Sequence, residues 1–119
     1  MNARLCYKSC GNTIITLESL PDTKCNELRN DIVNKLTAKH RGNKYKVISI
    51  INKFVNIKYD NVVNTNYENK KIIYYVGKII EEKTFDENLD KVCSNGIHYF
   101  RTKLCAFYYN LDLQHYTGD

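Results

Sequence analysis

The chain has 119 residues, the length of a single domain, and a formal net charge of +5. Hydrophobic residues make up 43% of it and charged residues 26%, which is typical of a folded globular protein and not of a disordered one. One proline and five glycines exclude collagen-like and linker-rich chains. The longest apolar stretches, Val47–Ile51 and Ile72–Val76, are much shorter than a membrane span.

Alternation of apolar and polar residues predicts two strands at the start of the chain. We expect the first over Ala3–Lys8 and the second over Thr13–Leu20, where Pro21 ends it because proline has no backbone N–H to donate. A helix is expected over Asp22–Lys39, because apolar residues recur there at helical spacing. These residues are Cys25, Leu28, Ile32 and Leu36.

The middle of the chain predicts two long strands separated by a polar segment. The strands are expected over Lys44–Ile57 and Lys70–Ile80, the second of them interrupted at Gly77. The segment Asp60–Asn69 is rich in asparagine, which favours turns, and we expect it to be an exposed loop or a hairpin tip.

The last third of the chain predicts a turn-rich segment, a short strand and a helix. Glu81–Val92 is acidic and turn-like, and Gly96–Phe100 is the expected strand. Apolar residues spaced three and four apart then predict an amphipathic helix that Thr102 caps and that reaches Leu111. We therefore expect residues 1–119 to form one small α+β domain, mainly antiparallel strands with a C-terminal amphipathic helix.

The most distinctive residues lie in segment 75–109. They are Tyr75-Val76-Gly77-Lys78, Thr84-Phe85-Asp86-Glu87-Asn88 and Cys93-Ser94-Asn95-Gly96-Ile97-His98-Tyr99-Phe100. These motifs resemble a module of unknown function found in giant-virus and phage proteins, marked by a Cys-x-x-Gly-Ile-His-[Phe/Tyr]-Phe signature. Ala3–Cys10 resembles its opening strand, and Lys39-His40-Arg41 occupies the place of its Lys-Cys-Arg motif. The resemblance implies a viral protein, located in the host cytoplasm or the virion, but no activity.

Five cysteines, odd in number and unevenly spaced, do not form the pattern of a disulfide framework. The resemblance implies a possible zinc site, because the module tends to carry cysteine where this chain has Cys10, His40 and Cys93, and it keeps His98. Cysteine and histidine are both zinc ligands. The alternative is that the two cysteines are small core residues and that His98 is hydrogen-bonded within the core.

The basic residues allow a nucleic-acid-binding surface. Lysines interleaved with tyrosines, among them Lys70 and Lys71, could follow phosphates while the rings stack on bases. The alternative is a solvated lysine-rich face that reflects AT-rich codons, because asparagine, isoleucine, lysine and tyrosine are all abundant.

A third interpretation starts from Gly96–Phe100 and the helix after it. This segment is similar to the Gly-Ile-Tyr-Phe-Ala element of ADP-ribosyltransferase-like folds, which implies an NAD- or ADP-ribose-binding pocket. Such a pocket also needs a histidine or arginine on an early strand and usually a late glutamate. Here the early strand offers Tyr7 and Lys8, and no glutamate follows Glu87.

We expect a non-enzymatic viral protein-interaction module, with a host or viral protein as its partner and no membrane association. Nucleic-acid binding and NAD or ADP-ribose binding are the alternatives. The candidate binding residues are His98, Tyr99, Arg101, Lys70 and Lys71. No cofactor is expected, apart from zinc if the four Cys and His positions converge.

Overall fold

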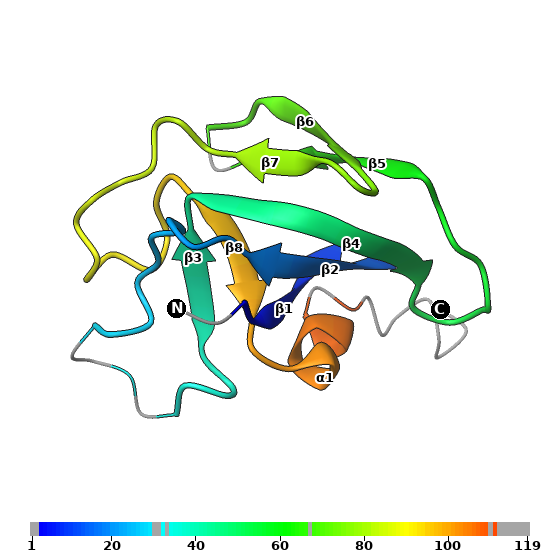
Figure 1. Ribbon diagram of the computed structural model, residues 1–119. Coiled ribbons are helices and arrows are strands. Elements are labelled where there is room, and N and C mark those ends of the chain that lie inside the picture. Colours follow the sequence, from blue (N-terminus) through cyan, green and yellow to red (C-terminus); the bar gives the residue numbers. More distant parts are fainter. Residues whose placement is uncertain (1–2, 30–31, 33, 67, 110, 112–119) are drawn as a thin grey trace.

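The computed structural model describes residues 3–29, 32, 34–66, 68–109 and 111. Six antiparallel strands form a curled sheet, a half-barrel with the order β3-β8-β1-β2-β4-β7, and β5 pairs with β6 in a separate hairpin (Figure 1). The strands are β1 (Leu5–Cys10), β2 (Thr13–Ser19), β3 (Lys39–Gly42), β4 (Lys44–Asn52), β5 (Asn61–Thr65), β6 (Lys71–Tyr75), β7 (Ile79–Glu81) and β8 (Ile97–Phe100). One short helix, α1 (Lys103–Tyr108), follows β8, which confirms the predicted α+β architecture.

The curl of the sheet has a local cause between β2 and β4. Thr16 pairs with Ser49, but the next residue, Leu17, pairs with Val47. Ile48 is therefore the extra residue of a β-bulge. Bulges bend a strand and increase its twist, so this one helps the sheet to close into a half-barrel.

The sheet has a core on each face. On the inner face, residues of β2, β4 and β8 such as Leu17, Val47 and Tyr99 pack together, and Tyr74 of the β5–β6 hairpin is buried against them. On the outer face, Ile14 and Phe100 pack against Ala106 of α1. The sheet accordingly lies between the hairpin and the helix (Figure 1).

Helix α1 begins where the sequence predicts. The hydroxyl of Thr102 accepts a hydrogen bond from the Cys105 amide at 3.3 Å, so Thr102 is the N-cap. The helix ends at Tyr108, earlier than the predicted Leu111. No helix in the described part of the chain is long and apolar enough to cross a membrane.

The predicted helix over Asp22–Lys39 is wrong. The described residues of this segment form turns and bends, and Lys39 already begins β3. Leu28 and Leu36, which were expected to face a core, are 81% and 55% exposed. The side chain of Asn26 explains the irregular path, because it is buried and bonds the Arg41 amide (2.9 Å) and the Lys91 carbonyl (3.2 Å). Tertiary hydrogen bonds override helical spacing here.

The middle strands differ from prediction mainly at their ends. β4 stops at Asn52, whose side-chain oxygen accepts hydrogen bonds from the amides of Phe54 (2.8 Å) and Val55 (3.1 Å) and so turns the chain. The expected loop or hairpin tip at 60–69 is part of a hairpin, but Asn61–Thr65 is a strand and not a loop. The predicted break at Gly77 is confirmed, since Gly77 has φ +86° between β6 and β7.

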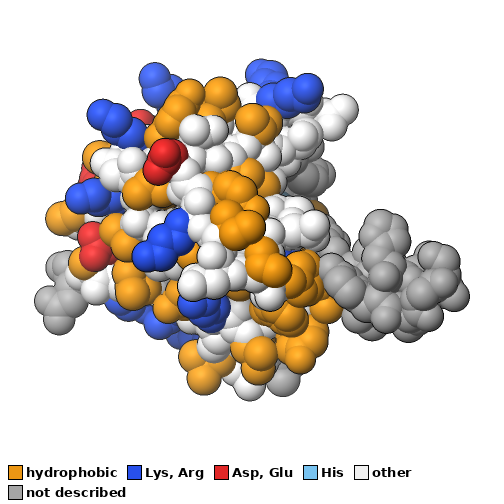
Figure 2. All heavy atoms as spheres, turned by 90° about the vertical axis from the view of Figure 1, so that its right-hand side faces the viewer, with side chains coloured by type: hydrophobic (Ala, Val, Ile, Leu, Met, Phe, Trp, Pro, Cys, Tyr) orange, Lys and Arg blue, Asp and Glu red, His pale blue; other side chains and the backbone are white. Residues whose placement is uncertain are grey.

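The loop after β4 carries exposed apolar side chains. Phe54, Val55 and Ile57 are all exposed, and the ring of Phe54 packs edge-on against Phe107 at 5.7 Å. This loop lies on the right of Figure 1, and hydrophobic side chains gather on that side of the molecule (Figure 2).

A buried arginine fixes the long segment 82–96 to the sheet. Arg41 of β3 is completely buried, and its guanidinium lies 4.8 Å from the Phe85 ring centre. The guanidinium donates to four backbone carbonyls, those of Asp86 (2.6 Å), Asn88 (2.5 Å), Lys91 (2.8 Å) and Asn95 (3.1 Å). We call this arrangement the Arg41 clamp. It holds in place a segment that has almost no secondary structure of its own.

The clamp predicts that Arg41→Lys destabilises the protein by about 3 kcal/mol, because one ammonium cannot replace the planar fork of donors and leaves buried carbonyls unpaired. Urea denaturation measures the free energy of unfolding, and trypsin cleavage after Lys83 and Lys91 reports release of the segment. Arg4→Lys, at an exposed position, is the matched control. Equal stability of the Arg41 and Arg4 variants would contradict the clamp.

Candidate functional site

Residues in and next to strand β8 line two separate cavities. His98 lines a cavity beside β1 and the β5–β6 hairpin. Tyr99 and Arg101 line a second, smaller cavity, next to Arg4 and Glu27. The structure therefore brings Tyr99 and Arg101 together but places His98 in a different site.

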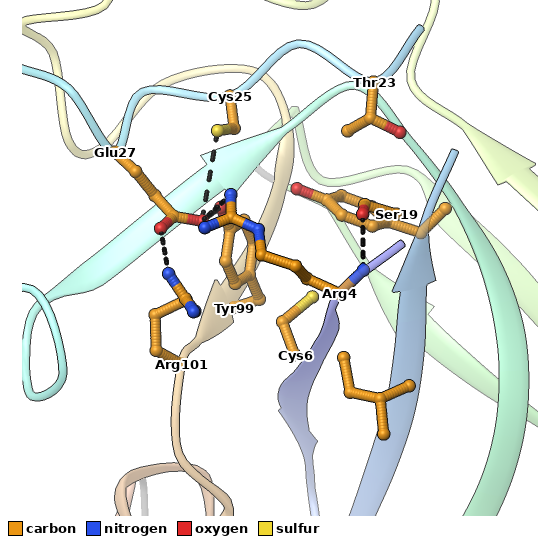
Figure 3. A pocket seen from close by; sticks show the side chains of 10 residues that line it. Arg4, Cys6, Ser19, Thr23, Cys25, Glu27, Tyr99 and Arg101 are labelled. Atoms are coloured by element: carbon orange, nitrogen blue, oxygen red, sulfur yellow. Dashed lines mark hydrogen bonds and ion pairs between the residues drawn. The ribbon is translucent and has the colours of Figure 1, made fainter. Parts of the chain in front are cut away.

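The second cavity is built around the carboxylate of Glu27 (Figure 3). The Tyr99 hydroxyl donates to Oε2, and Arg101 Nη1 donates to Oε1 at 2.6 Å. Arg4 Nη2 forms a longer ion pair with Oε2, at 3.7 Å. Burial alone would raise the pKa of Glu27, but the hydrogen bonds from Tyr99 and Arg101 outweigh it and hold this pKa below its ordinary value. Glu27 is thus an ionised, fully engaged carboxylate.

An open groove of about 680 Å³ adjoins this network and shares Arg4, Thr23, Cys25, Glu27 and Arg101 with the small cavity. The groove lies between the segment that follows Pro21 and the segment held by the Arg41 clamp. Its remaining lining residues are Lys24, Leu28, Lys35, Phe85, Glu87 and Leu89. Tyr99 is buried, so it supports the Glu27 network from below and does not line the open groove.

The cavity on the His98 side contains a buried lysine. Lys8 of β1 is only 8% exposed, and its ammonium donates to the His98 carbonyl at 3.1 Å. In the described part of the chain no carboxylate forms an ion pair with it. The pKa of Lys8 is lowered to about 8, mainly because burial disfavours the charged ammonium; Cys10 opposes this shift and Lys39 adds to it.

His98 is a neutral side chain in this setting. Its Nε2 lies 2.8 Å from the Ser94 carbonyl, so this nitrogen carries the proton and donates. Burial lowers the pKa of His98 to about 4, and the nearby cations Lys8, Lys39 and Arg41 act in the same direction. The hydrogen bond also ties β8 to the segment before it, as a core histidine would.

The four positions considered for zinc have separate partners. Cys10 is buried and contacts the Val63 carbonyl at 3.4 Å. The two ring nitrogens of His40 are engaged by Arg29 (3.3 Å) and by the Lys35 carbonyl (2.8 Å). Cys93 is exposed and has Lys39 Nζ 3.9 Å from its sulfur, while His98 bonds Ser94. No group of three or more His, Cys, Asp or Glu side chains within the described residues is placed to hold a metal ion.

Lys70 and Lys71 lie at the far end of the β5–β6 hairpin and are exposed. The Lys70 amide donates to the Asn66 side chain at 2.8 Å, which helps to close the hairpin turn. The pair is thus presented to solvent, apart from both cavities.

Sequence reasoning missed Glu27 and Lys8 as site residues. Glu27 lay in a segment taken for a helix, where nothing singles it out. Lys8 could have been found, because strand alternation places it on the same face as Cys6 and Cys10, two small apolar residues that the structure buries. A lysine at an inward position of a strand is unusual enough to deserve a functional hypothesis.

The comparisons with known proteins identify a family but no function. A family model, described as a family of unknown function (DUF5758), matches residues 1–106, which include every strand. The chain belongs to this family. No curated protein and no solved structure matches it. Because the function of this family is unknown, membership does not identify an activity, and the functional proposals rest on the two sites described above.

The pKa of Lys8 gives a testable pH dependence. Between about pH 8 and pH 10.5 the unfolded chain binds more protons at this residue than the folded one, so the Lys8 contribution to the free energy of unfolding rises with pH. Lys8→Met should therefore be more stable than the wild type at pH 7, by up to roughly 3 kcal/mol, and this advantage should shrink towards pH 10. Urea denaturation at both pH values measures it. The exposed Lys46→Met is the control, and a pH-independent advantage would contradict a buried charge at Lys8.

Proposed function

We propose that the chain is a non-enzymatic protein-interaction module that binds a segment of a partner protein in the open groove beside Glu27. The observation that carries this proposal is the composition of the groove. It combines exposed apolar side chains with basic ones over a floor whose polar groups already bond one another (Figure 3). Because these polar groups already form hydrogen bonds with one another, the floor of the groove is stable without a bound ligand.

The apolar walls of the groove favour a partner's hydrophobic side chain. Leu28 and Leu89 are exposed, and Phe85 is partly buried beside them. Exposed apolar groups that line a hollow gain free energy when a complementary side chain removes them from water. A leucine, isoleucine or phenylalanine of a partner fits this requirement.

The charges of the groove favour an acidic partner segment. Four basic residues line it, namely Arg4, Lys24, Lys35 and Arg101, against the two carboxylates Glu27 and Glu87. Glu27 is engaged by Tyr99 and Arg101, and Glu87 pairs with Lys24 at 3.2 Å. The excess positive charge, with Arg4 only loosely paired, would attract an aspartate or glutamate and speed the encounter.

The groove is held in shape before a partner arrives. The Arg41 clamp fixes the segment that carries Phe85 and Leu89, and Asn26 ties the opposite wall to the same segment through the Lys91 carbonyl. Because little ordering is needed on binding, more of the contact energy is available for affinity.

A viral origin is part of this proposal. It is supported by the resemblance of Cys93–Phe100 to the giant-virus and phage module and by the abundance of residues with AT-rich codons. On this view the partner is a host or viral protein, met in the host cytoplasm or the virion.

Selection of displayed random peptides on the folded chain tests the groove. We expect enrichment of peptides that place an aspartate or glutamate next to a large apolar residue. Leu28→Asp should weaken the selected peptides at least tenfold in fluorescence anisotropy, by adding a like charge and removing an apolar wall. Val55→Asp, at an exposed apolar position in the β4–β5 loop, is the matched control.

Peptides that bind Leu28→Asp as tightly as the wild type would contradict the groove as the binding site. Salt-dependent retention on single-stranded DNA, lost in a Lys70→Glu, Lys71→Glu double variant and accompanied by no peptide enrichment, would instead support the nucleic-acid alternative.

A further inference from the structure

A further cavity, adjoining the larger one that His98 lines, carries an inference independent of the groove. It lies where β1 and β8 meet, and the ladder between these strands has one described residue pair, Tyr7 with Phe100. Beyond that pair the Lys8 ammonium reaches the His98 carbonyl, so a side chain joins the two strands there. A polar cavity of about 170 Å³ lies at this place, lined among others by Lys8, Lys39, Asn64, Thr65 and Tyr109.

This cavity holds two cations and no anion. Lys8 and Lys39 both line it, and none of the described residues that line it is an aspartate or glutamate. Lys39 Nζ lies 3.2 Å from the Tyr109 hydroxyl, its other polar neighbour being the Cys93 sulfur at 3.9 Å. The described carboxylates that line the adjoining, larger cavity are those of Glu81 and Glu82. Glu82 there bonds Asn66 and Thr84.

A buried ammonium without a counter-ion is unfavourable unless something compensates it. An ammonium has three N–H donors, and the His98 carbonyl is the acceptor that the described residues supply to Lys8. A bound anion would both accept the remaining donors and neutralise the charge. Neutral amide and hydroxyl groups of Asn64, Thr65 and Tyr109 provide further donors around the same space.

We propose that this cavity is a binding site for the phosphate group of a small phosphorylated molecule, held between the ammonium groups of Lys8 and Lys39. The volume is several times the roughly 30 Å³ that a water molecule occupies, so a phosphate group fits. Two point charges with surrounding hydroxyl and amide donors suit a doubly charged tetrahedral oxyanion better than a singly charged carboxylate. The larger cavity of about 260 Å³ shares six lining residues with it and gives space for the rest of the molecule.

The titration of Lys8 supports this site and supplies a readout. Burial lowers the pKa of Lys8 to about 8, so part of the population is neutral near pH 8. The titratable groups that face Lys8 are Cys6 and Cys10 on its own strand, Lys39 on β3 and His98 on β8. An anion beside the ammonium would raise this pKa, so binding near pH 8 should be coupled to proton uptake.

Isothermal titration calorimetry with inorganic phosphate, at pH 8 and constant ionic strength, tests the proposal. We expect binding to the wild type whose enthalpy depends on the ionisation enthalpy of the buffer, because a proton is taken up. Lys8→Met should weaken binding at least tenfold and abolish the buffer dependence. Lys39→Gln, at a partly exposed position, should weaken binding without affecting the fold, and Lys46→Met should leave it unchanged. Circular dichroism verifies that each variant is folded.

Three results would overturn the site. The first is no binding at about 10 mM phosphate, together with no rise in melting temperature. The second is an affinity for phosphate in Lys8→Met and Lys39→Gln equal to that of the wild type. The third is acetate binding as tightly as phosphate. None of these results bears on the peptide groove, which shares no lining residue with this cavity and is tested with different variants.

Discussion

The fold depends on the burial of one guanidinium. Arg41 is placed by β3 at the edge of the half-barrel, and from there it bonds the backbone of a segment that has little structure of its own. Arginine suits this task because its planar fork offers five donors and remains charged at any pH the protein meets. Desolvating that charge is costly, and the four carbonyl acceptors offset the cost. The segment in turn supplies one wall of the groove and the approach to β8.

Strand β8 contributes to both candidate sites. Tyr99 points into the inner core and meets Glu27, while the strand's backbone at His98 receives the Lys8 ammonium. The two sites differ in whether their charged groups are paired with partners of opposite charge. Around Glu27 a carboxylate is matched by nearby donors, which makes a stable floor. Around Lys8 positive charge is left unmatched by the described residues, which favours a ligand.

Much of the sheet could be predicted from the sequence, because its strands alternate clearly and its turns carry Gly11, Gly77 and Pro21. The Thr102 cap was predictable for the same reason, as a local hydrogen-bonding signal. The path from Asp22 to Ala38 was not, because it is decided by Asn26 and Arg29, whose partners lie in β3 and, for Asn26, also at Lys91. The spacing of apolar residues contains no information about such long-range hydrogen bonds. For the same reason Glu27 gave no signal, whereas Lys8 did so through its position between two inward cysteines.

The open ends of the half-barrel also limit how it can bind. An unpaired edge strand normally invites another strand to add to the sheet. Here β7 has three residues, and the β3 edge is occupied by the chain itself, since the Arg41 carbonyl accepts the Asn26 amide at 3.1 Å and the Lys39 carbonyl accepts Arg29. At these two edges of the half-barrel, the backbone groups that could pair with a foreign strand are therefore few or already hydrogen-bonded. These two edges are accordingly poor templates for edge-to-edge self-association, and the proposed binding sites depend on side chains and hollows instead.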